Sequence, residues 1–117
     1  MKGILIDPVA RECSVVEVND DNVLQSLYDH LGCDTVELCA HQSNGDAIYV
    51  DEEGLFKQGL RSFQVFGAHQ PFFGRGLILG HDRDGNTVAP RLPYVTWINQ
   101  ISFSPQFEVG SVTEVTP

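Results

Sequence analysis

Residues 74–92 read GRGLILGHDRDGNTVAPRL, and this stretch predicts a β-hairpin. The apolar run Leu77–Leu79 precedes the pair Asp84-Gly85, and residues 87–89 lead back out. An Asp-Gly pair between two strand-like runs favours a tight turn, because such turns need positive φ angles that glycine adopts at little cost. With a two-residue loop, Arg83 pairs with Asn86 across the hairpin.

Short strand-like runs separated by turn signals continue on the N-terminal side of this hairpin. Strands are expected at residues 2–7, 13–18, 35–40, 47–51 and 62–66, and a loop at residues 67–74. The first two runs are joined by a short link that begins with Asp7-Pro8, where proline ends strand pairing. We therefore expect them to form an antiparallel pair.

One helix is expected at about residues 21–31. Residues 19–21 (Asn-Asp-Asp) supply a capping side chain and acids that suit the positive end of a helix, and Gly32 suits the C-terminal cap. One apolar stripe follows from the spacing of Val23, Leu24, Leu27, Tyr28 and Leu31. For residues 93–100 a second helix is preferred to a strand, since Val95, Ile98 and Ile101 have helical spacing. Residues 104–117 form either a terminal strand or a tail.

The elements together predict one α+β domain over residues 1–117, with the clear helix packed on one face of a mostly antiparallel sheet. The chain has 42% hydrophobic residues and no apolar run of membrane-spanning length, and its first residues are not expected to act as a signal peptide. Its three cysteines, Cys13, Cys33 and Cys39, have no Cys-x-x-Cys spacing, which is typical of reduced thiols. A soluble cytoplasmic protein is the resulting expectation.

The charge is unevenly distributed. Residues 1–58 hold three basic and twelve acidic residues, which accounts for the whole net charge of −9, whereas residues 59–117 hold four of each sign. An acidic protein repels phosphate backbones, so direct nucleic-acid binding is disfavoured. The charge serves either solubility or the binding of a basic partner protein.

Four motifs in a fixed order resemble a known family. The first strand ends in Asp7-Pro8, the helix closes in LGCD at residues 31–34, GDAIYVDEEGL follows at residues 45–55, and GRGLILG opens the hairpin at residues 74–80. This order resembles the domain of unknown function 3846, over roughly residues 2–92. The resemblance implies a protein of phages, plasmids or other mobile elements in a bacterial host cell, and it assigns no activity and no functional residue. The stretch after Pro93 departs from the charged helix expected there.

Several local patterns invite a ligand but fit one poorly. A calcium loop starting at Asp82 would need glycine and glutamate where Thr87 and Pro93 stand, so solvated acids at a hairpin tip are preferred. The glycines of residues 74–80 lead into a strand, whereas phosphate loops lead into a helix. The four histidines show no metal spacing, although His69 and His81 converge in one arrangement of the sheet. No metal, cofactor or catalytic residue is assigned, and an enzyme is the last of the hypotheses.

Three arginines that lie close together in the sequence are candidate ligands for a phosphate or carboxylate group: Arg75, Arg83 and Arg91. Strand parity puts Arg75 and Arg91 on opposite faces, so a single cradle is not expected. The better candidate ligand site is Arg75 with His69, Phe72 and Phe73 from the preceding loop. The alternative reading of the two phenylalanines is that they belong to the core.

Two functional hypotheses follow. The leading one is a non-enzymatic binding protein that acts on a host protein, such as a defence or regulatory protein, through the acidic residues Asp20, Asp21, Asp51, Glu52 and Glu53. The alternative is a protein that sequesters a nucleotide signal at the Arg75 site. In one version of this hypothesis the Arg75 site lies at a homodimer interface.

Overall fold

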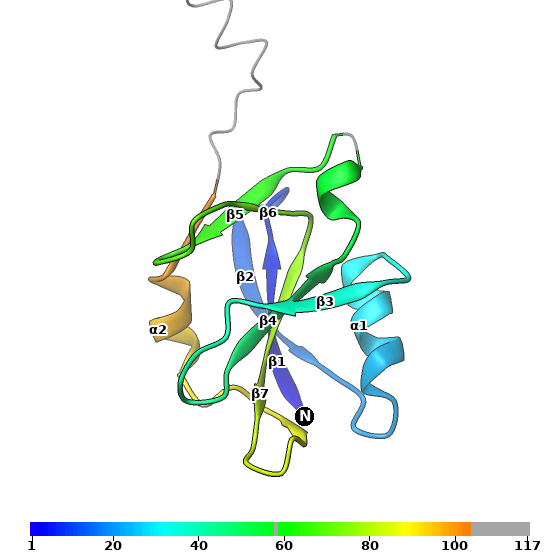
Figure 1. Ribbon diagram of the computed structural model, residues 1–117, viewed down its shortest axis with the longest axis vertical. Coiled ribbons are helices and arrows are strands. Elements are labelled where there is room, and N and C mark those ends of the chain that lie inside the picture. Colours follow the sequence, from blue (N-terminus) through cyan, green and yellow to red (C-terminus); the bar gives the residue numbers. More distant parts are fainter. Residues whose placement is uncertain (58, 104–117) are drawn as a thin grey trace, which may run out of the picture.

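Strand β7 (Gly76–His81) lies at the centre of the larger of two sheets. The structure is a computed structural model that describes residues 1–57 and 59–103. In this sheet β7 lies between β1 (Lys2–Asp7) and β4 (Ala47–Asp51), with β2 (Glu12–Glu17) outside β1 and β3 (Val36–Cys39) outside β4 (Figure 1). Each of these pairings is antiparallel, which confirms the expected β1–β2 pair. The central position explains why residues 76–80 are all buried.

The two faces of β7 carry two separate apolar clusters. Leu77 and Leu79 pack with Leu27 and Leu31 of helix α1 (Val23–Leu31), whereas Ile78 faces the other way. Ile78 packs in a cluster with Phe63 and Trp97, which come from the smaller sheet and from helix α2 (Tyr94–Ile98). Figure 1 shows α1 and α2 on opposite sides of the large sheet. The α+β class and the helix packed on one sheet face are therefore as expected.

Helix α1 begins at Val23, two residues later than the sequence suggested. Asn22 is the N-cap and its side chain accepts a hydrogen bond from the backbone N–H of Gln25, while the side chain of Asn19 accepts one from Asp21 instead. Gly32 ends the helix in the left-handed region, with a φ of 65°, as predicted. Leu24 was placed in the apolar stripe, but it is 50% exposed because α1 turns only Leu27 and Leu31 fully onto the sheet.

The smaller sheet was not anticipated. It contains β5 (Ser62–Val65) between β6 (Phe72–Phe73) and β9 (Ile101–Phe103). Residues 72–73 were expected in a loop, and a two-residue strand leaves almost no alternation for a sequence pattern to detect. Helix α2 is confirmed, but its buried residue is Trp97, and Val95 is 59% exposed. The expected strand or tail at residues 104–117 lies outside the described residues.

The hairpin exists with a different register. Strand β8 (Thr87–Val88) pairs with β7 so that His81 lies opposite Thr87, and the predicted pairing of Arg83 with Asn86 is wrong. The cause is the carboxylate of Asp82, which accepts hydrogen bonds from the backbone N–H groups of Asp84 and Asn86 and so widens the loop. Gly85 supplies the positive φ of 86° that this loop needs.

A buried carboxylate ties the C-terminal part of the described chain to the large sheet. Asp46, which directly precedes β4, is 0% exposed. Its carboxylate accepts hydrogen bonds from the backbone N–H of Arg91 at 2.8 Å, from that of Leu92 at 3.0 Å and from Trp97 Nε1 at 3.1 Å. These bonds fix the segment before α2 and orient Trp97 in the core.

Candidate functional site

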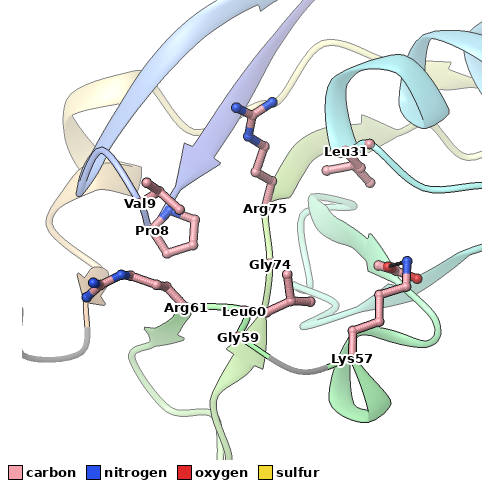
Figure 2. Close-up of a pocket in the computed structure, with 11 residues that line it drawn as sticks. Pro8, Val9, Leu31, Lys57, Gly59, Leu60, Arg61, Gly74 and Arg75 are labelled. Carbon is pink, nitrogen blue, oxygen red and sulfur yellow. Dashed lines mark hydrogen bonds and ion pairs between the residues drawn. The ribbon is translucent and has the colours of Figure 1, made fainter. Parts of the chain in front are cut away.

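A cavity of about 250 Å³ opens where the ends of β1 and α1 meet the start of β7. We call it the basic pocket, because its lining includes the cationic residues Lys57, Arg61 and Arg75. Figure 2 shows Arg61 and Lys57 on opposite sides of Leu60 and Gly74. The complete lining is Pro8, Val9, Leu31, Gly32, Asp51, Lys57, Gly59, Leu60, Arg61, Gly74 and Arg75.

Arg75 is held in place at the wall of the basic pocket. One terminal nitrogen donates a hydrogen bond to the carbonyl oxygen of His30 at 3.2 Å, and the other lies 3.6 Å from the carboxylate of Asp7. These contacts attach the residue before β7 to the end of α1 and the end of β1. The side chain is still 47% exposed, so its guanidinium remains accessible to solvent.

Lys57 forms an ion pair with Asp51 on the other side of the basic pocket. The distance from Nζ to the carboxylate is 2.5 Å, and the Asp51 side chain is only 7% exposed, against 41% for Lys57. The hydrogen bond to Asp51 raises the pKa of Lys57, so the ammonium stays protonated. The second oxygen of Asp51 accepts the backbone N–H of Glu53 at 2.9 Å. Asp51 therefore orients a cation rather than presenting a negative charge to solvent.

The ligand residues expected from the sequence do not gather at one place. Arg75 lines the basic pocket, whereas His69 is exposed in the loop before β6 and is not part of its lining. Phe72 packs against Phe63 with ring centroids 5.6 Å apart and contacts the core, as the alternative reading had it. Arg91 donates its backbone N–H to Asp46, directly before β4, at the opposite end of β7 from Arg75.

Sequence reasoning missed two cations of the basic pocket, Lys57 and Arg61. They reach it from the segment between η1 (Gly54–Phe56) and β5, which carries no recognisable motif. The one available signal was Lys57 itself, the only basic residue between Arg11 and Arg61 in an acidic half.

The five acidic residues predicted to bind a partner do not form one surface. The carboxylate of Asp20 lies 2.7 Å from the amino group of Met1, at the start of β1. Asp51 ends β4 at the other end of the sheet, since its neighbour Val50 pairs with Gly76, which in turn pairs with Ile6. Glu52 and Glu53 continue from there and are exposed, so they are separated from Asp20 and Asp21 by the length of the sheet.

A second hollow, of about 200 Å³, lies beside Glu52. We call it the acidic–aromatic groove; its lining is Glu37, Val50, Asp51, Glu52, Phe56, Gln70, Pro71, Phe72 and Phe73. Phe56 is 82% exposed. It belongs to η1, which approaches β6 so closely that a Cβ on Gly54 would lie 2.6 Å from the carbonyl oxygen of Phe73. The glycine therefore lets η1 hold an aromatic ring out at the edge of the groove.

Within residues 1–57 and 59–103 no three His, Cys, Asp or Glu side chains gather as metal ligands would. His81 is engaged by the hydroxyl of Tyr49 at 2.8 Å and by the carbonyl oxygen of Gly45 at 3.0 Å. None of the described helices has the length and apolar character needed to cross a membrane.

Comparisons with known proteins agree with the motif order. The model of the family described as "Domain of unknown function (DUF3846)" matches residues 1–96. The "Uncharacterized protein y4iR" of Sinorhizobium fredii (strain NBRC 101917 / NGR234) is 32% identical over 95 residues, which cover 79% of this chain. The match spans 58% of that relative's length. No solved structure matches the chain. The family match covers β1 to β8 and the start of α2, and the chain belongs to the DUF3846 family.

Proposed function

We propose that this chain is a small, non-enzymatic binding protein that captures a protein partner at the acidic–aromatic groove. The observation that carries the proposal is Phe56, a phenylalanine 82% exposed at the edge of a groove with apolar walls. Exposed aromatic rings beside a pocket are the usual anchors of protein interfaces.

Charge defines the kind of partner. Glu37, Glu52 and Glu53 are exposed around the groove or directly beside it, and the chain carries a net charge of −9. Acidic groups at the rim of an interface raise the association rate with a basic surface and reject an acidic one. The partner is therefore expected to present an apolar side chain flanked by lysine or arginine. In its concrete form, the proposal is a protein of a phage or other mobile element that acts on a host defence or regulatory protein.

A capture experiment with matched charge reversals tests the proposal. The groove variant combines Phe56→Ala, Glu52→Lys and Glu53→Lys, and the control combines Asp20→Lys and Asp21→Lys at the opposite end of the sheet. Wild type and both variants are immobilised and exposed to the same bacterial lysate, and retained proteins are quantified by mass spectrometry.

We expect a partner retained by wild type and by the control to be lost from the groove variant. The substituted groove side chains are exposed, so each change should alter the free energy of unfolding by no more than about 0.5 kcal/mol, and thermal unfolding checks this. Equal retention by the groove variant and wild type would remove the proposal.

A further inference from the structure

We propose that the protein partner binds as an extended segment that adds an antiparallel strand to the outer edge of β3. The segment presents lysine or arginine and an apolar residue toward the acidic–aromatic groove, and apolar residues on its other face. This inference rests on the proposed function, because the groove adjoins that edge through Glu37 of β3. It specifies the conformation of the partner and the main-chain hydrogen bonds that hold it.

The outer edge of β3 has unpaired backbone groups. Strand β3 is the last strand of the large sheet, and its one strand partner in the described part of the chain is β4. Directly before β3, the carbonyl oxygen of Thr35 accepts the backbone N–H of Glu52 at 3.2 Å. Because backbone groups alternate in direction along an antiparallel strand, Glu37 also faces β4, whereas Val36 and Leu38 face outward. Within the described chain, the outward N–H and C=O groups have no hydrogen-bond partner.

The opposite edge of the same sheet is closed by side chains. At one end of β2, the carbonyl oxygen of Cys13 accepts a hydrogen bond from the hydroxyl of Tyr94 in α2. At the other end, the carbonyl oxygen of Glu17 accepts one from the ring of His30 in α1, at 2.8 Å. Native sheets commonly protect exposed edges in such ways. The two edges therefore differ, and β3 is the one that can receive a further strand.

The two faces of an added strand would have different surroundings. Residues opposite Val36 and Leu38 lie on the α1 face of the sheet, where Val36 packs against the apolar cluster, so apolar side chains fit there. A residue opposite Glu37 lies on the other face, because Glu37 pairs with Val50 and both line the groove. A lysine or arginine forms a favourable cross-strand pair with the exposed Glu37. The next residue on this face is placed toward the groove that holds Phe56.

Charge favours a basic segment over a second copy of this chain. If two copies paired through β3 with Val36 opposite Leu38, their two Glu37 carboxylates would lie directly opposite each other, which is unfavourable. Each copy also carries a net charge of −9. A basic segment instead gains attraction from Glu37 and from Glu52, which line the groove.

The test measures binding of a labelled peptide, VKVFVKV, to the full chain by fluorescence polarisation. In an antiparallel pair with β3, the valine N–H groups point toward the protein and the lysine N–H groups point away. One comparison peptide is N-methylated at its two central valines, and the matched control peptide is N-methylated at its two lysines. A further peptide, VVKFKVV, keeps the composition and loses the alternation.

Two protein variants with the same charge change accompany the peptides. Glu37→Lys alters the β3 edge, and its matched control is Glu12→Lys, at an exposed position of β2. Circular dichroism verifies that both variants fold. Hydrogen exchange, followed by nuclear magnetic resonance, reports on the backbone N–H groups of Val36 and Leu38 directly.

We expect VKVFVKV to bind wild type at least tenfold more tightly than the valine-methylated peptide and VVKFKVV do. The lysine-methylated peptide should bind as VKVFVKV does. Glu37→Lys should weaken binding at least tenfold, and Glu12→Lys should weaken it far less. The amides of Val36 and Leu38 should exchange rapidly in the free protein and become protected when the peptide is bound.

The groove variant, with Phe56→Ala, Glu52→Lys and Glu53→Lys, separates this inference from the proposed function. If the groove variant loses VKVFVKV while valine methylation has no effect on wild type, the groove binds the peptide and strand addition is overturned. If valine methylation abolishes binding and the groove variant binds as wild type does, strand addition is supported and the groove proposal fails.

Other results would also overturn the inference. They include no binding of VKVFVKV at millimolar concentration, and a loss of affinity on lysine methylation as large as that on valine methylation. Slow exchange of the Val36 and Leu38 amides in the free protein would show that the edge is already occupied. Protection that rises with protein concentration would assign the edge to a second copy, and protection independent of concentration would assign it to a segment of the same chain.

Discussion

Replacing Asp46 by alanine removes the acceptor for three N–H groups at once, two from the segment before α2 and one from Trp97. A hydrogen bond to a charged group contributes about 1.5–3 kcal/mol. The backbone N–H groups of Arg91 and Leu92 are close enough to the surface for water to replace part of their loss. The indole N–H belongs to a side chain that is 0% exposed and stays unpaired. We therefore expect Asp46→Ala to lower the free energy of unfolding by about 3–5 kcal/mol, or the melting temperature by about 12–20 °C.

Asp46→Asn provides an internal comparison. The oxygen Oδ2 accepts from both Leu92 and Trp97, and Oδ1 accepts from Arg91. The single side-chain oxygen of asparagine can keep the hydrogen bonds from Leu92 and Trp97, whereas the hydrogen bond from Arg91 is lost. This variant should therefore cost about 1.5–3 kcal/mol, less than the alanine variant.

Urea unfolding monitored by tryptophan fluorescence measures all of these values, because Trp97 is the sole tryptophan. Asp84→Ala is the control, since Asp84 is exposed at the hairpin tip and should change stability by about 0.5 kcal/mol at most. A loss below about 1 kcal/mol for Asp46→Ala would refute the reasoning that this carboxylate holds α2 on the sheet.

Three further outcomes are expected. Gly76→Ala should cost about 1–3 kcal/mol in urea unfolding, because the added Cβ would lie 2.7 Å from Cζ of Phe63; an unchanged midpoint would contradict the close packing. Hydrogen bonds from Asn86 hold the pKa of Asp82 in the folded protein below its usual value of 3.8. The ionised Asp82 carboxylate therefore stabilises the fold above about pH 4, and this stabilisation is lost as the pH falls through the lowered pKa of the folded state. Asp82→Asn should flatten that acid limb of a stability–pH curve, and an unchanged limb would speak against it. Burial raises the pKa of Cys39 to about 12, so iodoacetamide at pH 8 should label Cys39 in urea but not in the native protein, as mass spectrometry can show.

The sequence predicted those parts of the fold in which local pattern and tertiary contacts agree. Strand β1 and the end of α1 at Gly32 follow from Asp7-Pro8 and from the apolar spacing of the helix. The hairpin register could not be predicted, because the side chain of Asp82 competes for the backbone N–H groups of the turn. Nor could β6, whose two residues are a strand only because β5 lies beside them.

The site was predicted only at Arg75. Lys57 and Arg61 line the basic pocket from the segment between η1 and β5. No motif or residue spacing in the sequence predicts the path of that segment. Asp51 was assigned to the partner surface because it belongs to the acidic half of the chain, together with Glu52 and Glu53. Its carboxylate is instead buried at the end of β4, where it accepts hydrogen bonds from Lys57, six residues later, and from the backbone N–H of Glu53.

The central place of β7 sets an order for synthesis on the ribosome. The hairpins β1–β2 and β3–β4 are complete by residue 51, but the strand that joins them ends only at residue 81. Until then the inner edges of β1 and β4 have unpaired backbone groups beside apolar side chains such as Ile6 and Ile48. Such edges invite pairing with other chains. The nascent chain therefore exposes these two strand edges for pairing with other chains until the last residues of β7 have been made.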